Sequence, residues 1–378
     1  MSGFSHTAPL LRNSPNSCRP NHDSFVKAAK DASGSIIPPY APSGGILTVN
    51  GTVILAFNGA VLDITALDDD TITHVPRVGE NDQFVMGLAG GGSIAEYNWG
   101  SSLSDNTTSF LQLMQFVDNI LLEALFDGYG RFNGGEWKDV FPASIVETVG
   151  SMAAQAYVHR STATDPLQHF KKDVLGRCAY KLPIAGVDGF LDTVLTLLLL
   201  QLGLYVNVGA SVASQDPWLV PALMTSLGAK SRMTAVVNMM QNHLAAAAPR
   251  EVALPADLVY SYAKGKYVSF CSEDDKELPF MDPVPLLSIV AKDVRPGGER
   301  VTRVSLEFED KKGEGKFVAW LGAYGDVKFT EINDKEADVP GELYGHVWGV
   351  VVKEKGLKLD QVAQNAVAGP EMIWIAGP

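Results

Sequence analysis

Hydrophobic positions are densest between Phe190 and Ala213, where apolar residues occupy nearly every face of a helix. Asp192, Gln201 and Asn207 interrupt this stretch. No window of ~18 residues is therefore free of charged and amide side chains, which disfavours a membrane span. A helix that is apolar on all sides is instead expected inside a protein core. Gln201 in its middle must find hydrogen-bond partners or contact a ligand, because a buried amide without partners is costly.

Hydrophobic residues at helical spacing predict three more long helices. The first begins at Ser109 and ends in the glycine-marked turn at 127–130, and the second covers 141–157 and continues to His159. The last runs from Pro221 to Ala248. Four long helices with apolar interiors predict an antiparallel bundle as the central architecture.

Strand-like runs lie on both sides of these helices. ILTV and TVILAF flank Asn50 and Gly51, a dipeptide typical of a two-residue hairpin turn. Apolar and polar residues alternate from Arg303 to Glu309, which predicts a half-buried strand in a small antiparallel unit. The predicted class is α+β, with a loosely ordered N-terminal arm (1–45), a β-rich insert (46–104), a helical bundle (105–250), a proline-rich connector (251–298) and a β-sandwich-like C-terminal domain (299–378).

The composition of the chain restricts the classes of binding partner and the cellular compartment that we expect. The chain has 378 residues and a formal net charge of -13, which argues against nucleic acid and anionic membranes as partners. Cys18, Cys178 and Cys271 are too few and too scattered to predict a disulfide framework or a zinc site. The first twenty residues contain no continuous apolar segment, so we expect no secretory signal. A reduced, cytoplasmic setting follows as the expectation.

Seven stretches, taken in order, carry a family resemblance. They are LLEALFDGYGRF (121–132), MAAQAYVH (152–159), LQLGLYVNVGA (200–210), LGAKSRM (227–233), LVYSYAKGKYVSFCSEDDKELPFMDPVPLLSI (258–289), KFVAWL (316–321) and VAGP (367–370). Together they span about residue 105 to the C-terminus, and they resemble the fungal ferritin-like proteins described as stress-response or late sexual development proteins. The resemblance implies a ferritin-like four-helix bundle. Segment 46–104 is longer than that family's usual lead-in to the first helix and would be an insertion.

The resemblance also implies a dimetal centre, with one Glu from each of two helices and a Glu-x-x-His pair from each of the other two. Carried over position by position, the six ligand positions hold Leu121, Ala156, His159, Gln201, Lys230 and Met233. Of these only His159 suits a hard dication, which prefers carboxylate oxygens and imidazoles. The chain would thus be a divergent member that has lost the metal, and we expect neither a metal nor another cofactor.

The vacated metal position is the first candidate site. If the alignment holds, His159, Gln201 and Lys230 face one another there. They would be the catalytic residues, holding and polarising a substrate carbonyl. The alternatives are that the three form a satisfied polar cluster, that Lys230 extends to the surface, or that a nearby carboxylate pairs with it. The nearby carboxylates are Asp118, Glu123 and Asp192.

Apolar walls around this position suit a bulky apolar substrate. The predicted substrate-binding residues are Leu121, Tyr205, Trp218 and Met233, although each aromatic taken alone is more typical of core packing. A second possible location is an interface between lobes, where Trp99, Trp218 or Tyr344 would contribute.

These features predict a cofactor-free enzyme of fungal secondary metabolism that cyclises or isomerises a terpenoid or polyketide, with a pericyclic, Diels–Alder-type closure as one option. One alternative is a non-catalytic stress or interaction protein whose bundle core has been filled, and another is a dimetal oxidoreductase. The expected partner is an apolar small-molecule substrate, with neither nucleic acid nor membrane. A homodimer stays open as an alternative.

Overall fold

The computed structural model describes residues 44–49, 52–57, 60–63, 89, 98–137, 140–176, 178–271, 278, 280, 282–291, 302–323 and 325–376. The chain divides into two compact units, Met1–Thr65 and Ala66–Pro378. The described part of the first is an antiparallel sheet of β1 (Gly44–Val49), β2 (Thr52–Phe57) and β3 (Ala60–Asp63). Val49 pairs with Thr52, so the predicted hairpin is confirmed. Nearly all of the predicted arm, and most of the predicted insert, lie outside the described residues.

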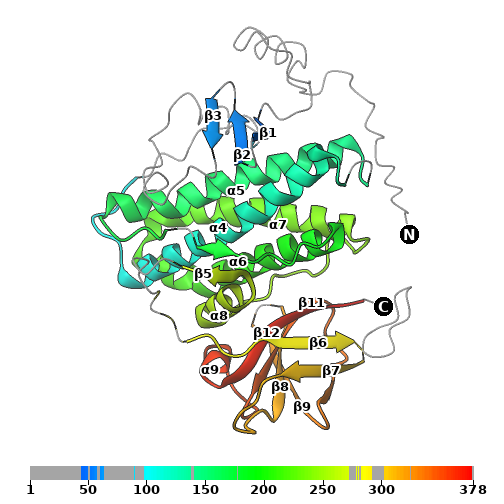
Figure 1. Ribbon diagram of the computed structural model, residues 1–378. Coiled ribbons are helices and arrows are strands. Elements are labelled where there is room, and N and C mark those ends of the chain that lie inside the picture. The colour runs from blue at the N-terminus through cyan, green and yellow to red at the C-terminus, as the bar shows by residue number, and fades with distance from the viewer. Residues whose placement is uncertain are drawn as a thin grey trace, which may run out of the picture. The chain divides into compact units, whose positions relative to one another are not determined.

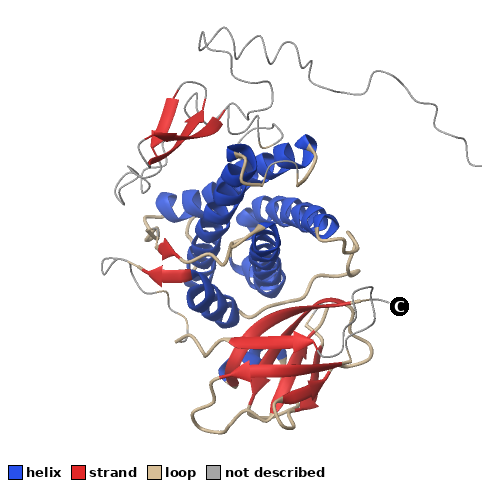
Figure 2. Ribbon diagram, turned by 45° about the vertical axis from the view of Figure 1, so that its right-hand side comes forward, coloured by secondary structure: helices blue, strands red, loops and turns tan. Residues whose placement is uncertain are grey.

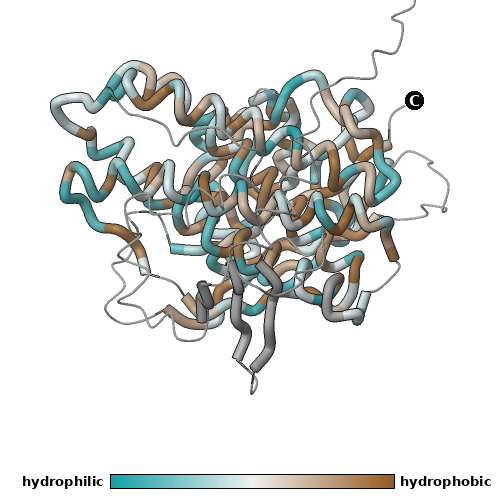
Figure 3. Tube along the Cα trace, turned by 90° about the horizontal axis from the view of Figure 1, so that it is seen from above, coloured by the Kyte–Doolittle hydropathy of each residue, from teal (hydrophilic) through white to brown (hydrophobic). Residues whose placement is uncertain are grey.

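Four long helices pack together in the second unit (Figure 1). Hydrophobic positions recur along them (Figure 3). Helix α4 packs against α5 and α6, and α6 packs against α7. The predicted number of long helices is confirmed, although three of the four are longer than predicted. Their bounds are Asp105–Gly134 (α4), Ala143–His169 (α5), Val187–Gln215 (α6) and Val220–Met240 (α7).

The end of α7 differs from the prediction. The helix ends at Met240, and the backbone at Asn242 has a φ of 60°, in the left-handed region. Because the chain turns there, Ala245–Ala248 form part of a loop in spite of the high helix propensity of alanine. This loop matters below, because it lines a pocket.

The start of α4 is tied to the end of α6. Ser104 caps α4 by accepting a hydrogen bond at Oγ from the backbone N–H of Thr107, at 3.3 Å. The same hydroxyl donates to Oδ2 of Asp216, at 2.6 Å. Asp216 directly follows α6, so this contact fixes the two helices relative to each other.

The C-terminal part contains two antiparallel sheets, seen as red strands beside the blue helices in Figure 2. Buried side chains of both sheets, among them Val304, Trp320 and Val351, form one hydrophobic core. The α+β class is therefore confirmed. The three-stranded sheet has the order β10 (Glu336–Asp338), β7 (Arg303–Phe308), β6 (Leu287–Ala291). The four-stranded sheet has the order β12 (Ala366–Ile375), β11 (Gly345–Val352), β8 (Phe317–Leu321), β9 (Val327–Glu331), with α9 (Leu359–Gln364) before β12.

The predicted connector at 251–298 contains regular secondary structure. It contains helix α8 (Ala256–Tyr267), which begins directly after Pro255 and buries one face against α4, α6 and β12. Proline fixes a backbone angle that suits the start of a helix, so the residue that suggested a linker marks an N-terminus instead. Through α8, the long helices and the C-terminal sheets pack on a common element.

A disulfide joins Cys178 to Cys271, with an S–S distance of 2.00 Å. The short strands β4 (Ala179–Tyr180) and β5 (Val268–Phe270) pair and bring the two cysteines together across 93 residues of chain. This bond was not predicted from the sequence, because so few and scattered cysteines indicate no disulfide framework. The cytoplasmic setting stays a prediction, and it no longer has the cysteine argument in its favour.

Helix α6 has the length and composition of a membrane span, and among the described helices it alone does. Most of its apolar window, 83%, is buried inside the protein. Its hydrophobic surface thus serves the packing of the core.

Candidate functional site

The centre of the long helices contains a buried ion pair. The ammonium of Lys230 on α7 donates to Oδ1 of Asp118 on α4 and to Oε1 of Gln201 on α6, both at 2.7 Å. Nε2 of Gln201 donates to the same carboxylate oxygen at 2.5 Å. All three side chains have an exposed fraction of 0%. Gln201, unexplained in the middle of an apolar helix, therefore has its hydrogen-bond partners within the protein.

Electrostatics explains why the pair stays together. Burial lowers the pKa of Lys230, and the negative charge and hydrogen bond of Asp118 oppose that effect. A charge that leaves water is tolerated when it is paired and hydrogen-bonded, and it is expensive when one partner is removed. One of the three carboxylates considered from the sequence, Asp118, is thus the partner of Lys230.

His159 lies near this pair and is not bonded to it. Its side chain on α5 is 8% exposed, and Nδ1 has no hydrogen-bond partner among the described residues. Burial lowers the pKa of His159 well below its ordinary value, and the positive charges of Lys230 and Arg232 lower it further. Lys230 and Gln201 are hydrogen-bonded to each other, as expected. In the part of the chain that the structure describes, neither of them forms a hydrogen bond with His159.

The donor set does not fit the dimetal centre that the resemblance implies. The ligand positions of α4 and α7 hold Leu121, Lys230 and Met233, and none of these side chains provides the carboxylate oxygen or imidazole that a hard dication requires. Among the described residues, no group of three or more His, Cys, Asp and Glu lies together. The ammonium of Lys230 supplies the positive charge at this place.

The four predicted substrate-binding residues pack in the interior or at the end of the helices. Leu121 and Met233 are buried, and the ring of Tyr205 meets Phe110 edge-on at 5.8 Å. Trp218 packs at 5.6 Å from each of two other rings, Trp99 and Phe170. None of the four lines the pocket described next.

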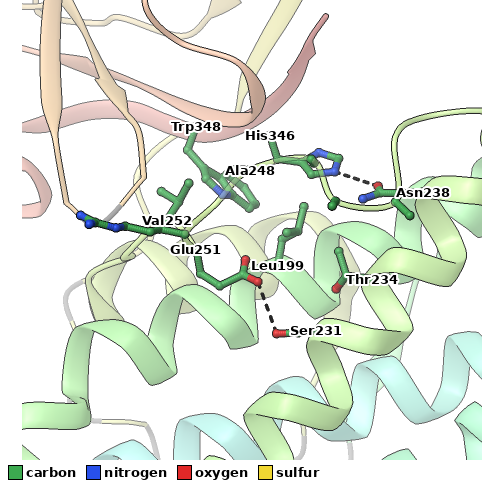
Figure 4. Close-up of a pocket in the computed structure, with 13 residues that line it drawn as sticks. Leu199, Ser231, Thr234, Asn238, Ala248, Glu251, Val252, His346 and Trp348 are labelled. Atoms are coloured by element: carbon green, nitrogen blue, oxygen red, sulfur yellow. Dashed lines mark hydrogen bonds between the residues drawn. The ribbon is translucent and has the colours of Figure 1, made fainter. Parts of the chain in front are cut away.

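A pocket of ≈ 130 Å³ lies between the helices and the C-terminal sheets (Figure 4). Helices α6 and α7 form one side, the loop after α7 forms a second, and β11 forms a third. Its walls combine apolar and polar side chains. They are Leu199, Ser231, Thr234, Asn238, Ala245, Ala246, Ala247, Ala248, Arg250, Glu251, Val252, His346 and Trp348.

Glu251 is the carboxylate of this pocket. Oγ of Ser231 donates a hydrogen bond to its Oε1 at 3.3 Å (Figure 4). Burial raises the pKa of Glu251, and the hydrogen bond from Ser231 partly opposes the rise. The segment that carries Glu251 is anchored, because the N–H of Leu254 donates to the carbonyl of Gly203 in α6 at 3.0 Å. A carboxyl group whose pKa is raised by burial is a stronger base than an exposed one, which suits a role in proton transfer.

His346 and Asn238 form a second polar pair in the same pocket. Nε2 of His346 lies 2.8 Å from Oδ1 of Asn238, so the imidazole N–H donates to the amide carbonyl. The imidazole is buried, which lowers the pKa of His346 to about 4, and the nearby His243 adds to this effect. His346 is therefore neutral at physiological pH and holds the Asn238 amide in one orientation.

Leu199 and Trp348 supply the apolar wall between the two polar pairs (Figure 4). The indole of Trp348 is held edge-on against the ring of Tyr262 on α8, at 5.7 Å. The pocket thus has a rigid apolar middle with a carboxyl group on one side and an amide on the other.

Sequence reasoning missed these residues, although it contained part of the signal. Ser231, Thr234 and Asn238 recur at helical spacing and give the predicted last helix a polar stripe. Glu251 and His346 have no such local pattern. The alternative site at a lobe interface stays a prediction, and its residues Trp99, Trp218 and Tyr344 do not line this pocket.

The chain matches no model of a known protein family, and no curated protein matches it. The resemblance to fungal ferritin-like proteins therefore stays a prediction from the seven sequence stretches.

Proposed function

We propose that the protein is a metal-independent acid–base enzyme that isomerises or cyclises an apolar carbonyl compound in the pocket between α6, α7 and β11. The observation that carries this proposal is Glu251, a partly buried carboxyl group with a raised pKa, which lines a pocket and accepts a hydrogen bond from a serine hydroxyl. Titratable groups perturbed by burial within a pocket are typical of acid–base sites.

The proposed chemistry is a proton transfer. The carboxylate of Glu251 takes the proton from the carbon beside a carbonyl group, which leaves an enolate, and the carboxylic acid then returns the proton to a different carbon. The substrate is isomerised with no net change in its atoms, and no oxidant or reductant is needed. A raised pKa makes Glu251 a stronger base than an exposed glutamate. Ser231 orients the carboxyl group through its hydrogen bond.

The bundle centre is not the site of this chemistry. Lys230 and Gln201 direct their polar atoms toward each other and toward Asp118, with no exposed surface through which a substrate would enter. The ammonium of Lys230 is held by a carboxylate and an amide oxygen inside the core, so it is not presented to a substrate.

The substrate class comes from the sequence prediction and from the pocket walls. Leu199, Val252, Trp348 and the alanines provide apolar surface, which suits a terpenoid or polyketide more than a sugar or a nucleotide. A ferritin-like ancestry with loss of the metal is part of the same proposal, and the ammonium of Lys230 in place of metal ligands supports it.

The test uses a panel of terpenoid and polyketide ketones dissolved in D₂O. NMR measures, for each ketone, how fast hydrogen is exchanged for deuterium at the carbon beside the carbonyl. The wild type should catalyse exchange or rearrangement of at least one ketone, and Glu251→Gln should lose ~10²-fold or more of the rate with its fold intact. Glu354→Gln, at an exposed glutamate, is the matched control and should keep the full rate. Full activity of Glu251→Gln would overturn the assignment.

The buried ion pair favours a second candidate, a non-catalytic protein with a filled bundle core. In that case no ketone of the panel would react, and the pocket would bind none of them. A dimetal oxidoreductase is not carried forward, because the donor set does not fit.

A further inference from the structure

We propose that Asn238 is the carbonyl-recognition group of the pocket, and that the part of the ligand it holds is a single six-membered ring bearing a ketone. This inference rests on the proposed function, because it names the substrate group that Glu251 would act on. It concerns binding alone, so it is tested without turnover.

The orientation of the Asn238 amide is the first argument. An asparagine offers one acceptor oxygen and two N–H donors. The N–H of His346 occupies the oxygen, at 2.8 Å, so the group that Asn238 presents to a ligand is its N–H₂. A donor in a partly apolar pocket recognises an acceptor such as a ketone oxygen, and it selects against a group without one, because its hydrogen bond would be lost.

The neutral state of His346 is the second argument. A fixed positive charge beside Asn238 would favour a carboxylate or phosphate ligand. The imidazole carries no charge at physiological pH, and the amide is neutral as well. On the other polar side of the pocket, the carboxylate of Glu251 disfavours anions, and the positive charge of the neighbouring Arg250 opposes this effect. A neutral oxygen acceptor is thus the ligand group that matches this side of the pocket.

The dimensions of the pocket set the size of the ligand group. Its volume is ≈ 130 Å³. An engineered apolar cavity of about 150 Å³ accommodates benzene. One ring therefore fills the space between Leu199 and Trp348, and the rest of a terpenoid or polyketide stays outside. The alanine side chains of the loop, for example Ala246, leave this room because they are small.

The experiment compares cyclohexanone with methylenecyclohexane, an isostere in which a CH₂ group replaces the ketone oxygen. Binding is measured by NMR titration of the full-length protein, with the Asn238 side-chain N–H₂ as the reporter. The wild type should bind cyclohexanone at least ~10-fold more tightly than the isostere, because one hydrogen bond distinguishes them. Ala246→Leu fills the pocket and should weaken the binding of both.

Asn238→Asp removes the donor and keeps an acceptor for His346, so it should abolish the preference for the ketone. Asn238→Leu removes the same donor without adding a charge and should also abolish the preference. Asn207→Asp, at an exposed asparagine of α6, is the matched control and should keep the preference. Glu251→Gln should retain the binding of cyclohexanone. Equal binding of the two ligands by the wild type, or a preference that survives in both Asn238 variants, would overturn the inference. Ketone-selective binding without turnover of any ketone would instead overturn the proposed function.

Discussion

Lys230 and Ser231 are neighbours in α7, and their side chains have different surroundings. Lys230 is sealed in the core with Asp118 and Gln201, whereas Ser231 meets Glu251 at the pocket. A polar side chain whose bonding capacity is used inside the core contributes to stability, and one that borders a pocket is available to a ligand. The residue type alone does not separate these roles, because lysine was the more attractive catalyst in the sequence.

Removal of one member of the ion pair should destabilise the protein strongly. Asp118→Leu or Lys230→Met leaves an uncompensated buried charge, and each should lower the free energy of unfolding by about 3–5 kcal/mol. The double variant, which replaces both charges by apolar side chains, should recover most of this loss. Urea unfolding of the three variants measures the effect. Single variants within about 1 kcal/mol of the wild type would contradict the assigned role of the pair.

Because burial lowers the pKa of His346, we expect the free energy of unfolding to depend on pH. The pKa of His346 falls from an ordinary 6.5 to about 4 in the fold, so protonation favours the unfolded chain. Its contribution is fully present above pH 6.5 and is lost as the pH falls from 6.5 through 4, by about 3 kcal/mol in total. His346→Gln should remove this part of the pH dependence. Unfolding curves at pH 7 and pH 4 check it, and an unchanged difference between the two pH values would refute it.

At the scale of elements, α6 positions both the core and the pocket. Its carbonyl at Gly203 accepts the hydrogen bond from Leu254, and a Cβ added to Gly203 would lie 2.7 Å from the Leu254 side chain. The absence of a side chain at Gly203 thus lets the segment of Glu251 approach the helix closely. Helix α8, which directly follows that segment, then packs against the sheets.

Gly203→Ala should therefore push this segment away and lower the free energy of unfolding by about 1–3 kcal/mol. Gly209 lies in the same helix with open space at its Cβ position, and Gly209→Ala should raise stability by about 0.5–1 kcal/mol. Thermal unfolding of the two variants gives opposite signs if the close approach is real. A gain in both would mean that the contact relaxes freely.

Local sequence patterns predicted that helices and strands are present better than they predicted the residues at which these elements end. Continuous apolar residues identified α6, and Asn50-Gly51 identified the first hairpin, because both signals lie within short windows of sequence. The end of α7 depends on the left-handed turn at Asn242, which competes with the propensity of the alanine run. Helix α8 was not predicted, because the sequence does not distinguish a proline before the first turn of a helix from a proline in a linker.

At the scale of the whole molecule, contacts between distant residues decide the site. Asn238 and His346 are 108 positions apart, and Asp118 and Lys230 are 112 apart. A pattern within one helix cannot identify such partners. The sequence therefore predicted the α+β class but no residue that lines the pocket. Glu251 and His346 became recognisable only when packing brought the helices and sheets together.

The disulfide restrains the part of the chain that contains α6, α7 and α8. Because it closes a loop of 93 residues, Cys178→Ser should lower the free energy of unfolding by about 2–4 kcal/mol under oxidising conditions. Cys18→Ser is the matched control, since Cys18 does not take part in this bond, and it should have no such effect. Three titratable thiols in unreduced, denatured protein would show that the bond is absent in solution.

The ammonium of Lys230 gives the interior of the helices a cation that is covalently part of the chain. Such a charge is delivered during translation and cannot dissociate, be chelated or be exchanged for a competing ion. The charge that faces Asp118 is therefore present whenever the chain is folded, without an ion from the cell.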